Sequence, residues 1–298
     1  MPTDSLHLLF PLLASLLFAT GLLLLKRATE AGTNPWTVTF VANQWAAILF
    51  SAFLLMESRP VEWSLLWQPA LVAVFYIVGQ VGTFSAIHHG DVSIAAPLFG
   101  IKVLLVAVFS TLIGGQSLAA AIWIAAILAT AGIALVQWSG KGHPRRILYT
   151  VASAMLASTS FSIFDVLVQK FCVSETAQWS TGRFLPLMFA CVAVYSIIFL
   201  RGFQVEKLKD RGIRKPLLFG GMLIALQAIC IVFTLSYFGD APRVNVVYSM
   251  RGIWGVLFAW GAAIIWGGSE AEVGRSTMVT RLCGAALITV SVVIAILA

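Results

Sequence analysis

Charged residues are scarce in this sequence, and their scarcity decides its class. Only 10% of the 298 residues are Asp, Glu, Lys or Arg, against roughly 25% in a typical soluble domain. Hydrophobic residues make up 60% of the chain, and the mean hydropathy is +0.95. The composition therefore excludes an ordinary soluble protein and predicts an all-α membrane protein that crosses the bilayer many times.

Motifs of known enzyme chemistry are also missing. The cysteines at positions 172, 191, 230 and 283 show no CxxC or Cys/His spacing, so neither a metal site nor a disulfide framework is expected. There is no HExxH, P-loop or nucleophile elbow. His88, His89 and Asp91 are neighbours, but without further ligands they indicate a hydrated turn. We expect neither an enzyme nor a cofactor.

Ten apolar stretches are long enough to cross a bilayer, which takes about 20 residues. They cover residues 5–26, 35–56, 67–88, 92–113, 118–138, 147–170, 183–200, 216–238, 241–266 and 278–297. No Lys or Arg precedes the first stretch, so it is expected to be a retained helix and not a cleaved signal. The connections are short and leave no room for a soluble domain.

The fourth and ninth stretches resemble each other and each carries one central cation. A shift of 149 positions brings Lys102 onto Arg251. The same shift aligns Gly90 and Asp91 with Gly239 and Asp240, while Gly114 and Gly115 correspond to Gly267 and Gly268. The match predicts two five-helix repeats, residues 1–140 and 141–298; the alternative is coincidence. Because five is odd, the repeats would have inverted topology, which places a substrate site near the midplane.

Loop charges predict the orientation. Thirteen cations lie at one end of the predicted helices, namely Lys26, Arg27, Lys141, Arg145, Arg146, Arg201, Lys207, Lys209, Arg211, Arg214, Lys215, Arg275 and Arg281. Only Arg59, Lys170, Arg183 and Arg243 lie at the other end. Since cytoplasmic loops are enriched in Lys and Arg, both termini are predicted to lie outside the cytoplasm. The net charge of +7 thus reflects topology and does not indicate nucleic-acid binding.

Lys102 and Arg251 are the leading candidates for substrate binding. A cation at the bilayer centre costs roughly 2.5 to 3.5 kcal/mol on insertion scales, and this sequence places one there twice. Together they could bind a carboxylate or phosphate. Alternatively, each is a structural charge with an acidic partner. Asp165 is the only clear carboxylate inside a predicted span, so it cannot neutralise both cations.

The sixth stretch carries a polar stripe. Ser158, Ser162, Asp165 and Gln169 recur at helical spacing and so share one face. This face could line a cavity with Asp165 as a gate or counter-ion, or it could hydrogen-bond to neighbouring helices.

Further polar residues lie deep in the predicted spans. Those assigned to the substrate site are Asn43, Tyr76, Gln80, Gln227 and Tyr248. Tyr248 precedes Arg251 by three residues, so the two share a helix face. Individually such residues more often make packing hydrogen bonds, but as a set around two cations they predict a hydrated pocket.

These features resemble the drug/metabolite transporter superfamily, EamA type. The resemblance rests on two five-helix halves, a polar fourth helix leading into Gly-Gly, and Gly132 echoed by Gly284. EamA-like halves carry a Glu after the fourth helix; here the second half has Glu270 and the first has Gln116. Phosphate-translocating branches use cations on helices four and nine, which Lys102 and Arg251 match. The resemblance also implies cytoplasmic termini, contrary to the loop charges.

The sequence therefore predicts a multi-pass carrier in the plasma (inner) membrane of a bacterium. It would move a small organic anion by alternating access. Two alternatives stay open: an exporter of amino acids or other zwitterionic or amphipathic metabolites, and a non-transporting membrane scaffold. The expected partners are the substrate and the lipid bilayer. One chain supplies both halves, so a monomer is sufficient, although a dimer is compatible with the sequence.

Overall fold

A computed structural model describes all residues except 1, 58–59, 90–91, 138–146, 175–176 and 267–274, and within the described residues it contains helices and no strand. The α-helices are α1 (Leu9–Glu30), α2 (Pro35–Ser51), α3 (Trp67–His88), α4 (Val92–Leu98), α5 (Lys102–Leu112), α6 (Ala120–Val136), α7 (Ile147–Val173), α8 (Thr181–Tyr195), α9 (Arg211–Tyr237), α10 (Ala241–Tyr248), α11 (Arg251–Trp266) and α12 (Arg275–Leu297). Short 3₁₀ segments, Ala52–Met56 and Ser196–Gly202, extend α2 and α8.

Most of the helices are long and apolar enough to span a bilayer. Eight such spans occur among the described residues, and α6 is a shorter apolar helix. Large hydrophobic side chains such as Leu22, Ile127 and Leu282 are at least half exposed on the outer surface, where lipid would cover them. The chain is thus a multi-pass integral membrane protein, as its composition predicts.

The fourth and ninth expected helices are interrupted, whereas the sequence predicted continuous stretches over residues 92–113 and 241–266. The fourth consists of α4, a 3₁₀ turn at Phe99–Ile101, and α5. The ninth consists of α10, a turn at Ser249 and Met250, and α11. Pro97 accounts for the first interruption, because proline removes a backbone donor inside a helix. In the second, the N–H of Gly252 donates to the carbonyl of Ser249 at 3.0 Å, a 3₁₀-type bond.

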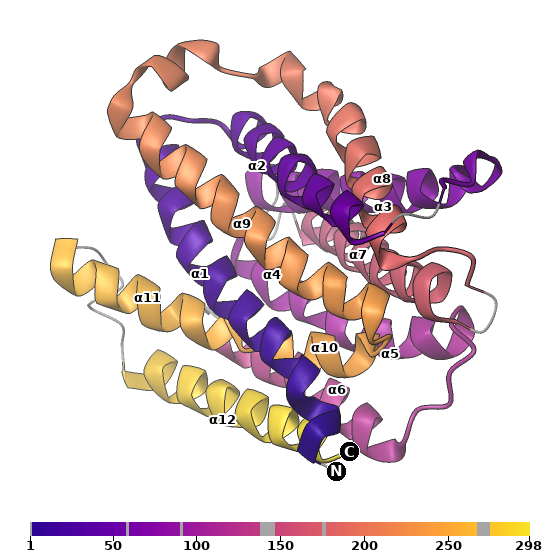
Figure 1. Cartoon of the computed structure of the whole chain (residues 1–298). Helices are drawn as coiled ribbons and strands as arrows, with labels where there is room; N and C mark the ends of the chain where they lie inside the picture. The colour runs from indigo at the N-terminus through magenta and orange to yellow at the C-terminus, as the bar shows by residue number, and fades with distance from the viewer. Residues whose placement is uncertain (1, 58–59, 90–91, 138–146, 175–176, 267–274) are drawn as a thin grey trace.

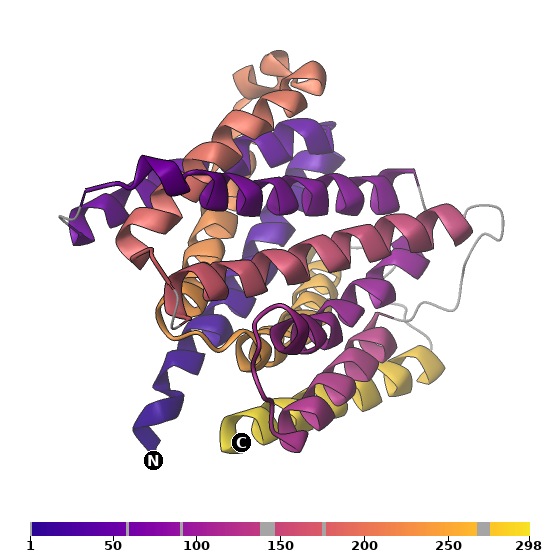
Figure 2. The same ribbon diagram turned by 90° about the vertical axis from the view of Figure 1, so that its right-hand side faces the viewer.

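Three long-range helix pairs organise the bundle: α1 with α9, α3 with α7, and α6 with α12. α1 and α9 run side by side in Figure 1, and α6 lies against α12 in Figure 2. Glycines allow these close approaches. A Cβ added to Gly132 of α6 would lie 2.9 Å from the carbonyl oxygen of Gly284 in α12, and the reverse distance is 2.7 Å. Gly21 of α1 and Gly220 of α9 meet in the same way, at 3.2 and 3.1 Å. Small residues thus set the spacing, as is common between membrane helices.

The packing of α1 and α7 is reciprocal. α1 contacts α9 and α11, whereas α7 contacts α3 and α5. The first helix of each expected half therefore packs against the third and fourth helices of the other half. The expected boundary at residues 140 and 141 lies outside the described residues, as do Gly90, Asp91, Gly267, Gly268 and Glu270.

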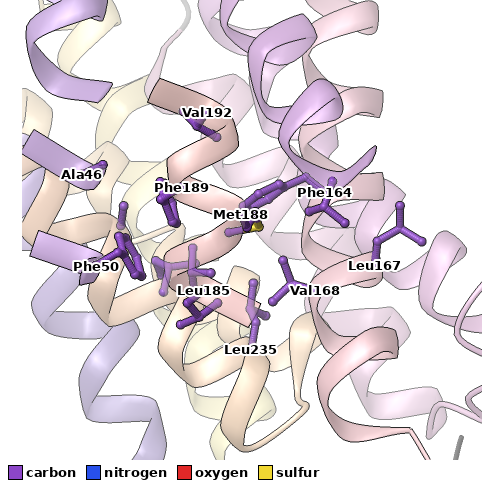
Figure 3. Close-up of a cluster of buried hydrophobic side chains, with 14 of the residues drawn as sticks. Ala46, Phe50, Phe164, Leu167, Val168, Leu185, Met188, Phe189, Val192 and Leu235 are labelled. Carbon is purple, nitrogen blue, oxygen red and sulfur yellow. The ribbon is translucent and has the colours of Figure 1, made fainter. Parts of the chain in front are cut away.

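An aromatic and aliphatic core lies between α2, α7, α8 and α9 (Figure 3). The rings of Phe50 and Phe189 stack with centroids 3.8 Å apart and planes 9° from parallel. Met188 and Leu235 are fully buried beside them. The core joins α2, from the expected first half, to three helices of the expected second half, so the two halves share one hydrophobic interior.

Candidate functional site

Lys102 and Asp165 form an ion pair inside the bundle. Lys102 is the first residue of α5, and its Nζ lies 2.8 Å from Oδ2 of Asp165 on α7. The exposed fractions of the two side chains are 13% and 3%. A buried pair of this kind attracts strongly, but removing its charges from water costs several kcal/mol per ion. The carboxylate therefore acts as the counter-ion that lets Lys102 remain inside the protein.

Hydrogen bonds hold Asp165 and its helix in place. The side-chain amide of Asn245 on α10 donates to the same Oδ2 atom at 2.8 Å. Ser162 donates to the backbone carbonyl of Lys102 at 3.2 Å, and the backbone N–H of Ala241 donates to Oε1 of Gln169 at 2.9 Å. The polar stripe of α7 thus faces α5 and α10. Ser162 and Gln169 thus join helices and Asp165 is a counter-ion, while the lining of a cavity by this stripe stays a prediction.

Arg251 is held by aromatic rings and not by an acid. Its guanidinium carbon lies 4.4 Å from the ring centroid of Tyr248 and 5.3 Å from that of Phe18 on α1. Over the described part of the chain, no ion pair forms at Arg251. Asn245, which donates to Asp165, lies on α10 just before the turn that leads to Arg251, so both cations belong to the same part of the bundle. The site therefore contains two cations and one carboxylate.

Each cation directly follows a tightened turn in the middle of a span. Lys102 follows the 3₁₀ turn at Phe99–Ile101, and Arg251 follows the turn at Ser249 and Met250. The hydroxyls of Ser249 and of Ser158, on the polar face of α7, are buried and have no hydrogen-bond partner among the described residues. A 3₁₀ segment inside a helix often marks a hinge. The turn at Ser249 and Met250 thus combines local irregularity with a polar group that a ligand could satisfy.

Other predicted site residues lie apart from this ion pair. Asn43 and Gln80 bond to each other through both side-chain amides, at 2.9 and 2.8 Å, and Asn43 also donates to Ser196. Gln227 is partly buried on α9 and makes no side-chain hydrogen bond within the described residues. The assignment of these three residues as substrate ligands stays a prediction.

Tyr76 lies nearer to the cations, through aromatic contacts. Its ring packs edge-on against Phe161 with centroids 5.9 Å apart, and the Nζ of Lys102 lies 5.9 Å from the centroid of the same Phe161 ring. Sequence reasoning missed both Phe161 and Phe18. Phe161 precedes Asp165 by one helical turn, a spacing that could have identified it. Phe18 lies on a distant apolar helix, and no pattern in the sequence marks it.

Two surface grooves lie at the ends of the bundle, and neither is lined by Lys102 or Arg251. The first, of about 730 Å³, contains His7, Asp240 and Arg243. There, Oδ2 of Asp240 lies 3.2 Å from Nε2 of His7 and 2.6 Å from Nε of Arg243. This cluster ties the start of the chain to the start of α10. The second groove, of about 590 Å³, lies between α1 and α9.

Comparison with known proteins agrees with this architecture. Residues 5–138 match the model of the EamA-like transporter family. No curated protein matches the chain. A solved structure described only as "Crystal structure of protein" is similar with a TM-score of 0.65 and 16% sequence identity, over 97% of each chain, which shows a shared fold. Residues 5–138 thus resemble the EamA-like transporter family, a similarity that supports a membrane transporter of small molecules.

Proposed function

We propose that this protein is a secondary carrier for small organic anions and that Lys102 and Arg251 bind the substrate. The observation that carries the proposal is a surplus of positive charge: among the described residues, Asp165 pairs with Lys102, and Arg251 packs on aromatic rings without an acidic partner. An uncompensated cation in a membrane interior is costly, and such residues commonly mark substrate pathways. A bound anion would supply the missing negative charge.

Arg251 is the better placed of the two to receive the anion. Its planar guanidinium can donate two parallel hydrogen bonds to a carboxylate or phosphate. The rings of Tyr248 and Phe18 restrict its orientation without taking up its charge. Lys102 already contacts Asp165, so its role would be to add positive potential. The unpartnered hydroxyl of Ser249, two residues before Arg251, could donate a further hydrogen bond.

We further propose alternating access by two inverted repeats, residues 1–140 and 141–298. The contacts of both cations cross between these units, since Lys102 pairs with Asp165 of the second unit and Arg251 packs on Phe18 of the first. Rocking of one repeat against the other would change these contacts. The two mid-span turns beside the cations would serve as hinges. We place the protein in the plasma (inner) membrane of a bacterium.

A second candidate substrate is a zwitterionic metabolite such as an amino acid. Asp165 favours it, because this carboxylate lies beside Lys102 and could accept an ammonium group. Its side chain is only 3% exposed and already receives hydrogen bonds from Lys102 and Asn245, so the anion is the better supported substrate. Competition between succinate and leucine for uptake would separate the two candidates.

Uptake into proteoliposomes tests the proposal. Vesicles containing the purified protein would be assayed with radiolabelled succinate, glycerol 3-phosphate, leucine and putrescine. We expect uptake of at least one anion, and loss of that uptake in Lys102→Gln and Arg251→Gln. Lys26→Gln is the matched control, because it removes one cation from an exposed helix end. Unchanged transport in both site variants would refute the role of the two cations.

A further inference from the structure

The groove between the C-terminal end of α1 and the N-terminal end of α9 has a charged rim and an apolar floor. Arg27 on α1 and Arg211 and Lys215 on α9 supply three cations, and Glu30 is the acidic residue in its lining. Leu24 and Phe219 form part of the apolar lining, and 56% of the Phe219 side chain is exposed. The two helices lie side by side where this groove forms (Figure 1). We call it the α1–α9 groove.

The acidic groups near the groove are already partly compensated. Lys26 Nζ lies 3.9 Å from Oε1 of Glu30, one helical turn away. Asp210 precedes the groove as the N-cap of α9, and its Oδ1 accepts a hydrogen bond from the N–H of Gly212 at 2.8 Å. Among the described residues, Arg211 and Lys215 form no ion pair, so a positive surplus remains at the rim. The N-terminal end of the 27-residue helix α9 adds to it through the helix dipole.

The depth of the groove in the membrane distinguishes between anionic ligands. α1 and α9 both belong to candidate membrane spans, and the cations lie at the ends of these spans. We therefore expect Leu24 and Phe219 on the hydrocarbon side and the cations at the surface of the bilayer. A free phosphate would contact the rim alone. A phospholipid would place its phosphate at the rim and its acyl chains over the apolar floor. The loop charges assign this end to the cytoplasmic side, where anionic lipids are attracted to basic segments.

We propose that the α1–α9 groove is a binding site for an anionic phospholipid. Bound there, the lipid would join α1 to α9, which are the first helix of one proposed repeat and the third helix of the other. The site lies apart from Lys102 and Arg251 and does not depend on the identity of the transported substrate. It requires that the chain spans a membrane and, for the preference for anionic lipids, that this end faces the cytoplasm as the loop charges predict.

Thermal unfolding of the detergent-purified full-length protein tests this site. Dioleoyl phosphatidylglycerol would be titrated as mixed micelles, with dioleoyl phosphatidylcholine and inorganic phosphate in parallel. We expect phosphatidylglycerol alone to raise the melting temperature in a saturable manner. In Arg211→Gln/Lys215→Gln the apparent affinity should fall about 25-fold, because each interfacial cation contributes a factor of about five.

Arg201→Gln/Lys209→Gln is the matched control, since it removes two exposed cations from the neighbouring loop and leaves the groove intact. This control should retain the affinity of the native protein for phosphatidylglycerol. Equal stabilisation by phosphatidylcholine would overturn the proposal, as would an unchanged affinity in the groove variant. Stabilisation by inorganic phosphate to the same extent would also overturn it, because the ligand would then be a free anion. If the groove variant does not fold, a single substitution supplies the same test. The amount of phosphatidylglycerol that stays bound through purification is then compared between Arg27→Gln and the native protein, and equal amounts would overturn the proposal.

Discussion

At the scale of single residues, the site depends on how differently its two cations are held. Lys102 has a carboxylate at 2.8 Å, whereas Arg251 has two aromatic rings. Cation–π contacts hold a guanidinium in place without neutralising its charge, which stays available to an anion. Arg251 should therefore govern substrate affinity, and Lys102 should govern both affinity and stability.

Two substitutions of Arg251 should separate the contribution of its charge to substrate affinity from the contribution of its planar shape. Arg251→Gln removes a charge-assisted hydrogen bond, which is worth about 1.5 to 3 kcal/mol, so substrate affinity should fall about 10- to 150-fold. Arg251→Lys keeps the charge and loses the planar fork, so its affinity should be intermediate. Binding isotherms of the transported anion would measure both variants. Equal affinity in Arg251→Gln and the native protein would contradict this role.

Asp165→Asn should destabilise the protein, because it leaves the ammonium group of Lys102 without its counter-ion. Breaking one side of a buried pair costs about 3 to 5 kcal/mol of the free energy of unfolding. Lys102→Gln/Asp165→Asn should be less destabilised than the sum of the single variants, since no unpaired charge remains. Thermal unfolding of the three variants gives the coupling, and strict additivity would show that the pair does not stabilise the fold.

The sequence predicted the three charged residues of the central site but not which groups each of them contacts. Lys102, Asp165 and Arg251 stand out because charges are rare in apolar spans. Whether Asp165 pairs with Lys102 or with Arg251 depends on how α5, α7 and α11 are placed in space. Phe18 could not be predicted, since one phenylalanine on an apolar helix resembles its neighbours. Asn43 and Gln80 were identified by polarity alone, and polarity does not reveal that their amides pair with each other.

At the scale of helices, the crossing of α6 and α12 depends on glycine. Gly284→Val would place side-chain atoms where a Cβ already meets the backbone of α6 at 2.7 Å. We expect overpacking to lower the free energy of unfolding by about 1 to 3 kcal/mol. Gly255→Ala is the control, because a Cβ there meets nothing within 4 Å. Thermal unfolding measures both, and an undisturbed Gly284→Val would mean that the helices do not approach this closely.

Helix positions were predictable because apolar length is a strong signal in membrane proteins. The third expected stretch, residues 67–88, coincides with α3. The interruptions at Phe99–Ile101 and at Ser249 and Met250 were harder to foresee. Pro97 marks the first of them. The second contains no proline, so its tightened turn depends on tertiary packing and not on local propensity.

At the scale of the whole molecule, the loop charges predict an orientation that labelling can check. In a background with the native cysteines replaced, Ser117→Cys and Glu206→Cys would place single thiols at exposed positions on opposite ends of the bundle. With both termini outside, a membrane-impermeant maleimide should label Ser117→Cys in intact cells. Glu206→Cys should react only after permeabilisation. The reverse pattern would show cytoplasmic termini and would contradict the positive-inside interpretation.

The most direct test of the central basic site is ligand-induced stabilisation of the purified protein. The panel comprises succinate, glycerol 3-phosphate, leucine and putrescine, applied to the native protein and to Lys102→Gln/Arg251→Gln. A ligand at 100 times its dissociation constant adds about 2.7 kcal/mol to the free energy of unfolding. We predict that an anion stabilises the native protein and not the double variant. If no anion stabilises the native protein, or if the double variant is stabilised equally, the two cations are structural and the proposed substrate site is wrong.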